Sequence, residues 1–269
     1  MSTTDSGEPE IVIRELADFA GKVAIVTGAS RGIGVAIARR LAKDGLKVAL
    51  VARSRDAIES LARELGGIAV TADVTAKGAS EAILQEVEAR LGPVSVLVPN
   101  AGVEASYKLA ATSDEAWETV MATNATSVFR LCRAALPTMV GRGYGRVVVV
   151  ASTAALVGYA YTAAYCASKH AVVGLVKAIA MEIATSEVTI NAVCPGFVDT
   201  PMTDRSVARI VEKTGRDATA AKDALAKTSP QHRLFEPEEI AHLVASLLPA
   251  GARGIHGQAI AISGGGIYG

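Results

Sequence analysis

Short apolar runs alternate with longer segments of helical periodicity along most of this 269-residue chain. The runs are apolar throughout and cover residues 23–27, 47–51, 67–71, 95–99, 146–151, 189–193 and 258–262. The helical segments cover residues 32–44, 55–65, 77–91, 113–138, 160–183 and 236–248. Strands that alternate with helices form a parallel sheet through right-handed crossovers, and uninterrupted apolar strands are typical of a sheet covered on both faces. The pattern therefore predicts an α/β fold of three layers, α/β/α, with a central parallel sheet.

The alternation never breaks for long enough to indicate a domain boundary. We expect a single domain over residues 21–269, preceded by a tail over residues 1–20 that ends in a short docking segment at residues 11–19. One irregular stretch, residues 198–233, contains Pro201, Gly215 and Pro230. An insertion at this position favours a mobile lid over a binding site, and the alternative is a pair of surface helices without a role.

The composition excludes several classes of function. Lys plus Arg and Asp plus Glu both number 27, so neither nucleic acid nor an anionic membrane is an expected partner. The three cysteines are widely spaced and the four histidines show no ligand spacing, so we expect neither disulfides nor a metal site. The N-terminus does not resemble a secretory signal, and no apolar run is long enough to span a bilayer. These features favour a cytoplasmic protein.

A glycine-rich turn follows the first predicted strand. Residues 28–34 read G-A-S-R-G-I-G and open the first predicted helix. Glycine allows the backbone to approach a pyrophosphate, and a helix N-terminus offers N–H donors and partial positive charge. In this context the turn predicts a Rossmann-like dinucleotide site, and the alternative is a tight connection without a ligand. The cofactor-binding residues expected here are Gly28, Ser30, Arg31, Gly32, Ile33 and Gly34.

The residue after the second predicted strand distinguishes the two nicotinamide cofactors. An acidic residue there would bind the adenosine ribose hydroxyls of NAD, but the position holds Arg53, and Arg31 lies in the glycine turn. Two cations suit the 2′-phosphate of NADP, so NADP(H) is the preferred cofactor and NAD(H) the alternative. Two solvated surface arginines would fit the same pattern. After the third strand, Asp73 could accept a hydrogen bond from the adenine, with Val74 beside it, or could equally start the next helix.

Tyr165 and Lys169 are four residues apart in the predicted helix 160–183, so they lie on one helix face. A free tyrosine has a pKa of about 10, and a nearby ammonium lowers it. The phenol then becomes a usable general acid or base, and Ser152 after the fifth strand could hold the substrate oxygen. The same spacing is common on exposed helices, so the inference depends on the glycine turn upstream.

The sequence resembles the classical short-chain dehydrogenases/reductases over nearly the whole chain after about residue 20. The matching segments are residues 27–34, residues 100–102, Asn124, Ser152, residues 165–169 and the Pro195-Gly196 pair. The resemblance implies a catalytic tetrad of Asn124, Ser152, Tyr165 and Lys169. Tyr165 would donate or accept the proton, Lys169 would bond the nicotinamide ribose and lower the Tyr165 pKa, and Ser152 would orient the carbonyl.

The resemblance implies further roles. Asn124 would hold a helix irregularity and a water that links Lys169 to solvent, and the alternative is an exposed helical asparagine. Val198, through its backbone, and Thr200, through its hydroxyl, would meet the nicotinamide carboxamide. The chain departs from the family pattern at Pro99, which lacks an N–H, so we expect a local change at the end of the fourth strand. The other cofactor-binding residues implied are Asn100, Ala101, Gly102, Tyr165, Lys169, Pro195 and Gly196.

The segments around Ser152, Tyr165 and residues 193–197 are similar to the 3-oxoacyl and polyketide ketoreductases of this family. The resemblance implies an NADP(H)-dependent oxidoreductase that reduces a ketone, a 3-oxoacyl thioester on CoA or a carrier protein or a polyketide-like compound, to a secondary alcohol. The alternatives are an NAD(H)-dependent hydroxyacyl-CoA or alicyclic alcohol dehydrogenase and, from another class, a non-catalytic dinucleotide sensor. Family members are usually homotetramers, so a homotetramer is expected. The groups that select the substrate are expected in residues 198–233 and near residues 104–108.

Overall fold

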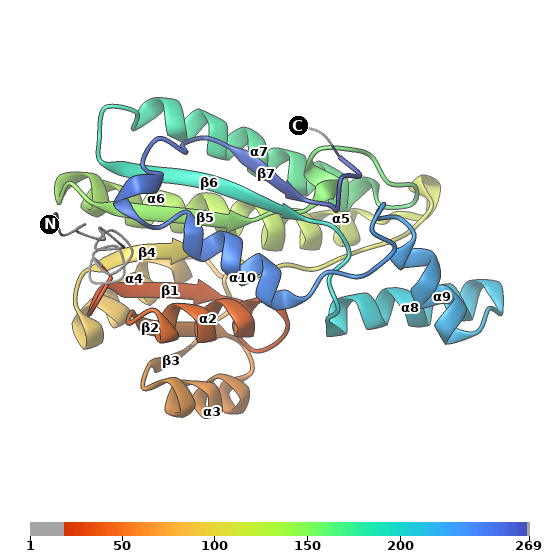
Figure 1. The fold of residues 1–269 in the computed structure, drawn as a ribbon, viewed down its shortest axis with the longest axis horizontal. Helices are drawn as coiled ribbons and strands as arrows, with labels where there is room; N and C mark the ends of the chain where they lie inside the picture. The colour runs from red at the N-terminus through yellow and green to blue at the C-terminus, as the bar shows by residue number, and fades with distance from the viewer. Residues whose placement is uncertain (1–18, 268–269) are drawn as a thin grey trace, which may run out of the picture.

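The computed structural model describes residues 19–267 and contains one seven-stranded parallel sheet (Figure 1). The strand order is β3-β2-β1-β4-β5-β6-β7. The expected docking segment, apart from Phe19, lies outside the described residues. The predicted Rossmann-like α/β fold is confirmed. The strands are β1 (Val23–Thr27), β2 (Lys47–Ala52), β3 (Ile68–Thr71), β4 (Val94–Val98), β5 (Gly145–Val150), β6 (Val188–Pro195) and β7 (Ala259–Ile262).

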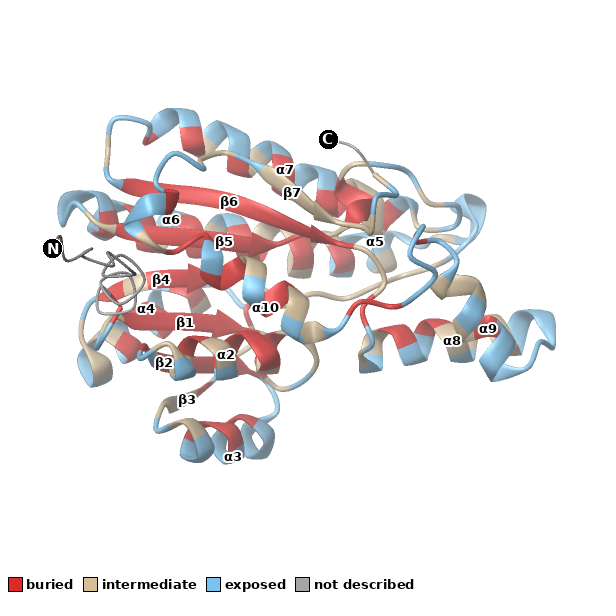
Figure 2. Ribbon diagram, in the orientation of Figure 1, coloured by how far each residue is buried: buried red, intermediate tan, exposed pale blue. Residues whose placement is uncertain are grey.

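Helices cover both faces of the sheet, which explains why its strands are apolar on both sides. Ala24 and Val26 of β1 belong to the apolar core shared with α2 (Ile33–Lys43), α3 (Arg55–Leu65) and α10 (Pro237–Ser246). Val23 and Ile25 belong to the core shared with α4 (Ala79–Leu91), α6 (Ser127–Gly141) and α7 (Ala163–Glu182). Figure 2 shows the central strands β1, β2, β4, β5 and β6 mostly buried between these two layers, whereas β7 is of intermediate burial.

Two helices of the structure differ from the predicted ones. The helix expected at 113–138 is divided into α5 (Asp114–Met121), a π-helical turn (Ala122–Thr126) and α6. The helix expected from residue 160 begins as α7 at Ala163, because Tyr161 has a left-handed φ of 67° that no helix accommodates. Both changes lie beside the predicted catalytic residues.

The order of the strands creates a crevice at the carboxyl ends of β1 and β4. The chain reaches the β3 edge and then returns to pair β4 with β1, and such a reversal is where open α/β sheets bind ligands. The Asn100 side chain joins the two strand ends by donating to the carbonyl oxygens of Thr27 (2.9 Å) and Gly28 (3.3 Å). β4 ends at Val98, so Pro99 lies just outside the strand, and its carbonyl oxygen accepts from the Val150 N–H at 2.9 Å.

The irregular stretch 198–233 contains α8 (Pro201–Thr214) and α9 (Ala218–Ala226), which project beyond the arrowheads of the strands (Figure 1). Lys222 of α9 pairs with Asp199 at 3.0 Å. The mobility of this segment as a lid stays a prediction. No helix within residues 19–267 is both long and apolar enough to cross a membrane.

Candidate active site

A pocket of about 690 Å³ lies over the glycine turn at the carboxyl ends of β1 and β2. Gly28 and Gly32 have φ values of 66° and 55°, which side-chain-bearing residues rarely adopt. A Cβ on Gly28 would also stand 2.8 Å from the Cα of Ala101, so the turn depends on glycine. Among the described residues 19–267, no side chain caps the N-terminus of α2 at Gly32, and the first turn of α2 has no acidic residue. The turn therefore presents a helix N-terminus that suits an anion.

Gly34 supports this turn from beneath and does not line the pocket. A Cβ here would collide with the Gly28 carbonyl oxygen and stand 2.7 Å from Nδ2 of Asn100. Its missing side chain allows α2 to pack closely against the turn. The remaining predicted residues of this part of the site line the pocket, namely Ser30, Arg31, Ile33, Asn100, Ala101 and Gly102.

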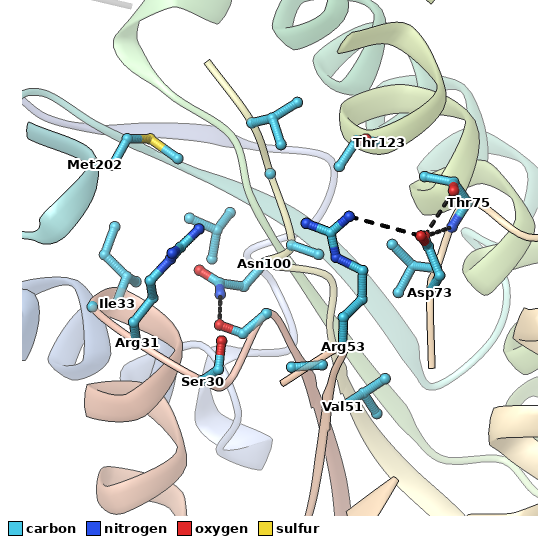
Figure 3. A pocket seen from close by; sticks show the side chains of 18 of the residues that line it. Ser30, Arg31, Ile33, Val51, Arg53, Asp73, Thr75, Asn100, Thr123 and Met202 are labelled. Carbon is cyan, nitrogen blue, oxygen red and sulfur yellow. Dashed lines mark hydrogen bonds and ion pairs between the residues drawn. The ribbon is translucent and has the colours of Figure 1, made fainter. Parts of the chain in front are cut away.

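Two arginines extend along the pocket near Asn100 in Figure 3. Arg31 comes from the glycine turn and Arg53 from the loop after β2, and both are exposed. The Arg53 guanidinium turns toward Asp73, with Nη1 3.9 Å from Oδ2. The pocket therefore carries two cations where the sequence pattern predicts the 2′-phosphate.

The Asp73 carboxylate is fixed by its neighbour in the chain. It accepts hydrogen bonds from the Thr75 hydroxyl (2.7 Å) and the Thr75 N–H (2.9 Å), and these bonds lower the Asp73 pKa. The alternative that Asp73 starts a helix is wrong, because α4 begins at Ala79 after Gly78. Val74, the next residue, is buried and also lines the pocket.

Tyr165 and Lys169 lie one turn apart near the N-terminus of α7, where both line the first pocket. Lys169 is buried, its Nζ lies 5.8 Å from the centre of the Tyr165 ring, and it donates to the Val150 carbonyl oxygen at 3.0 Å. Burial lowers the Lys169 pKa to about 8. Burial also raises the Tyr165 pKa to about 12, against a hydrogen bond from Ser152 that lowers it.

The structure therefore does not show the expected lowering of the Tyr165 pKa by Lys169. The ammonium is directed at the Val150 carbonyl, and withdrawal of the phenol from water outweighs the other influences on it. At neutral pH the Tyr165 phenol is therefore protonated.

Asn124 lies in the π-helical turn between α5 and α6 and is 1% exposed, so the alternative of an exposed helical asparagine is wrong. Its Nδ2 donates to the Val103 carbonyl oxygen (2.9 Å) and to Ser168 Oγ (3.0 Å), and its Oδ1 accepts from the Val103 N–H (2.9 Å). Asn124 thus joins the loop after β4 to α7, one residue from Lys169.

Ser152 follows β5 and begins a short 3-10 helix (Thr153–Ala155), where its Oγ accepts from the Ala154 N–H at 3.1 Å. The neighbouring Thr153 hydroxyl is 3.0 Å from the Tyr159 hydroxyl. Ser152 lines a second pocket, of about 620 Å³, whose walls are mostly apolar. Tyr165 lines both pockets and so stands where they meet. Pro195, Gly196 and Val198 line the second pocket, and Thr200 lines both.

A family model described as short chain dehydrogenase matches residues 22–210. The chain belongs to the short chain dehydrogenase family. The resemblance noted in the sequence is confirmed, and so is the prediction of an oxidoreductase that interconverts C=O and CH–OH groups.

Relatives in this short chain dehydrogenase family match along almost their whole length. A putative ketoacyl reductase of Streptomyces coelicolor is 41% identical over 251 residues, which cover 91% of this chain and 96% of that protein. The 3-oxoacyl-(acyl-carrier-protein) reductase FabG of Vibrio cholerae is 39% identical over 247 residues, 91% and 97% of the two chains. The crystal structure of a variant actinorhodin polyketide ketoreductase with NADPH has a TM-score of 0.89 and 40% identity, and the match covers 92% and 98% of the chains.

Two charged side chains of the second pocket were not predicted individually. Glu104 and Arg209 form an ion pair there, with Nη1 and Oε1 3.0 Å apart. They are 105 residues apart in the sequence, so no local pattern joins them. Within residues 19–267 no three His, Cys, Asp or Glu side chains are grouped in a way that could hold a metal ion.

Proposed function

We propose that this enzyme reduces a ketone to a secondary alcohol with NADPH, and that Tyr165 supplies the proton. The observation that supports this most is the position of Tyr165, which lies where the pocket over the glycine turn meets the second, mostly apolar pocket. A cofactor in the first pocket and a ketone in the second would meet at this side chain. The proposal agrees with the activities of the relatives, which are named ketoacyl and polyketide reductases.

The residues of the first pocket fit NADPH. The glycine turn and the N-terminus of α2 suit the pyrophosphate, and Arg31 and Arg53 suit the 2′-phosphate. Bound NADPH supplies the hydride that reduces the carbonyl carbon. We assign further contacts with the cofactor to three residues. Lys169 would bond the nicotinamide ribose, and Val198 and Thr200 would bond the nicotinamide carboxamide. The other cofactor-binding residues are the ones that the sequence predicts.

The proposed proton transfer uses two side chains of α7, the partly buried Tyr165 and the buried Lys169. Ser152 orients the carbonyl oxygen, and the Tyr165 hydroxyl gives its proton to that oxygen as the carbon gains the hydride. The Tyr165 pKa of about 12 keeps the phenol protonated at neutral pH, which is the form that reduction requires. Lys169, with a pKa of about 8, is suited to return a proton to the tyrosinate. Asn124 bonds to Val103 in the loop after β4 and to Ser168, the residue before Lys169 on α7.

The finer assignments belong to the same proposal. We infer a single domain over residues 21–269 with a lid at residues 198–233, and a 3-oxoacyl thioester or polyketide-like ketone as substrate. An NAD(H)-dependent hydroxyacyl-CoA or alicyclic alcohol dehydrogenase and a non-catalytic dinucleotide sensor are the competing functions. The homotetramer and the cytoplasmic location stay predictions.

A turnover assay separates these functions. Purified protein should consume NADPH in the presence of ethyl acetoacetate, with a kcat/KM at least about tenfold above that for NADH. The absorbance of the reduced nicotinamide and the fluorescence of the bound dinucleotide are the two measurements. Binding of NADPH without consumption with any ketone would favour the sensor, and faster oxidation of 3-hydroxyacyl-CoA with NAD would favour the dehydrogenase.

Reversing the charge of Arg53 should change the cofactor preference. In Arg53→Glu a carboxylate stands near Asp73 and repels a 2′-phosphate, so we expect the Kd for NADPH to rise about 10- to 100-fold and that for NADH less than about threefold. Fluorescence titration measures both constants. Arg55→Glu is the matched control, because Arg55 is exposed two residues away and does not line the pocket. Equal losses for both dinucleotides in Arg53→Glu would contradict the NADP assignment.

A further inference from the structure

Glu104 and Arg209 face each other on the wall of the second pocket from different elements. Glu104 lies in the loop after β4 and Arg209 on α8, and Nη1 donates to Oε1 at 3.0 Å. The buried Ser206, one turn earlier on α8, donates from Oγ to Glu104 Oε2 at 2.8 Å. The side chains of Arg209 and Glu104 are 28% and 17% exposed. Both carboxylate oxygens therefore have a partner on α8, and the guanidinium is held in a fixed place.

The Arg209 guanidinium has donors to spare. A guanidinium carries five N–H groups. In the part of the chain that the structure describes, Glu104 is the one acceptor bonded to it. Because Arg209 lines the second pocket, the remaining donors are available to a molecule that enters it.

Glu104 also determines which acceptor suits these donors. Its carboxylate neutralises the guanidinium at hydrogen-bond distance, so a carboxylate on the ligand would compete with Glu104 for the same cation. An uncharged oxygen accepts an N–H without that competition and costs less to withdraw from water. The surrounding wall is mostly apolar, with Phe197, Ile210 and Leu225 among its members, so the pair is a polar point in an apolar pocket.

We propose that Arg209, held in place by Glu104, is a specificity-determining residue that binds a second, uncharged oxygen of the ketone substrate. The chemical class is a ketone with an ester, thioester, ketone or phenol oxygen away from the reacting carbonyl. Arg209 touches the substrate, whereas Glu104 is a positioning residue that also sets the charge preference. The inference rests on the proposed ketone reduction, with the substrate in the second pocket.

Two ketones of matched length test the role of Arg209. Ethyl acetoacetate carries a second oxygen function and 2-heptanone does not. In Arg209→Met, which keeps much of the length without the donors, kcat/KM for ethyl acetoacetate should fall about 10- to 100-fold, mainly through KM. The value for 2-heptanone should stay within about threefold, because the hydrocarbon chain has no acceptor to lose. If 2-heptanone turns over too slowly, its Ki as a competitive inhibitor replaces KM.

The control is Arg205→Met on the same helix, because Arg205 is exposed and lines neither pocket. Both ketones should keep their kcat/KM within about twofold in this variant. Equal losses for the two ketones in Arg209→Met would overturn the assignment, since they would mean that Arg209 merely holds α8. Failure of the wild-type enzyme to reduce either ketone with NADPH would instead contradict the proposed function.

A second variant tests the charge preference. Glu104→Gln keeps the size of the side chain and an acceptor for Ser206, but leaves the Arg209 charge without its counter-ion. The ratio of kcat/KM for acetoacetate to that for ethyl acetoacetate should rise about 5- to 10-fold above the wild-type ratio. A general loss of packing would lower both values and leave the ratio unchanged, and an unchanged ratio would overturn the role given to Glu104.

Discussion

Replacing Tyr165 with phenylalanine is expected to lower kcat for ketone reduction by about 100- to 10,000-fold, the usual contribution of a general acid. The change removes one oxygen from a side chain at the junction of the two pockets. The ring still fills its place on α7, so NADPH should bind with a Kd within about threefold of the wild type. The loss should therefore appear in kcat and in kcat/KM alike, as it does when an interaction of the transition state is removed.

Steady-state kinetics with NADPH and ethyl acetoacetate, together with fluorescence titration of NADPH, measure the two quantities separately. Tyr107→Phe is the matched control, because Tyr107 is an exposed tyrosine that lines neither pocket, and its kcat should be unchanged. A Tyr165→Phe enzyme that keeps more than about a tenth of its turnover would show that the proton comes from another group.

The secondary structure that local rules determine was predicted closely. α3 covers the predicted residues 55–65, because the left-handed Gly66 ends it. The seven strands were visible as apolar runs, because each is covered on both faces. The misjudged helix at 113–138 contains the π-helical turn at Asn124, whose side chain bonds to Val103 and Ser168 on other segments. Such contacts between distant segments leave no periodicity in the sequence.

The same distinction applies to the site. The glycine turn and the Tyr165–Lys169 spacing are local, so the sequence pattern places them correctly on the first pocket. The direction in which the Tyr165 pKa shifts depends on burial and on the bond from Lys169 to Val150 of β5. The spacing of residues in the sequence indicates neither of these. The Glu104–Arg209 pair joins the loop after β4 to α8, so it can be recognised only in the folded chain.

The buried Lys169 ammonium should make the protein less stable at neutral pH than it is in alkali. Its folded-state pKa of about 8 lies below the usual 10.5, so at pH 7 the charge is present in both states and the cost of burying it is full. Between pH 8 and 10.5 the unfolded chain binds the extra proton, so this cost disappears as the pH rises. The difference between the two pKa values corresponds to about 3 kcal/mol.

Lys169→Met should therefore show opposite effects on activity and on stability. We expect turnover to fall by about 100-fold or more, since the side chain proposed to bind the ribose and return the proton is lost. The free energy of unfolding at pH 7, without nucleotide, should rise by about 1 kcal/mol, because the ammonium is no longer buried. This rise is smaller than the full cost of burial, because the Val150 carbonyl oxygen also loses its hydrogen-bond donor. By pH 10.5 the variant should be the less stable protein by about 2 kcal/mol.

Urea unfolding at pH 7 and pH 10.5 measures this reversal. Lys177→Met is the matched control, because Lys177 is exposed on the same helix and its replacement should change the free energy of unfolding equally at both pH values. Taking the difference between variant and wild type at each pH cancels the titration of the other tyrosines and cysteines. If Lys169→Met were destabilising by the same amount at both pH values, the Lys169 ammonium would not be strained by burial. Its proposed part in returning the proton to Tyr165 would then lose its physical basis.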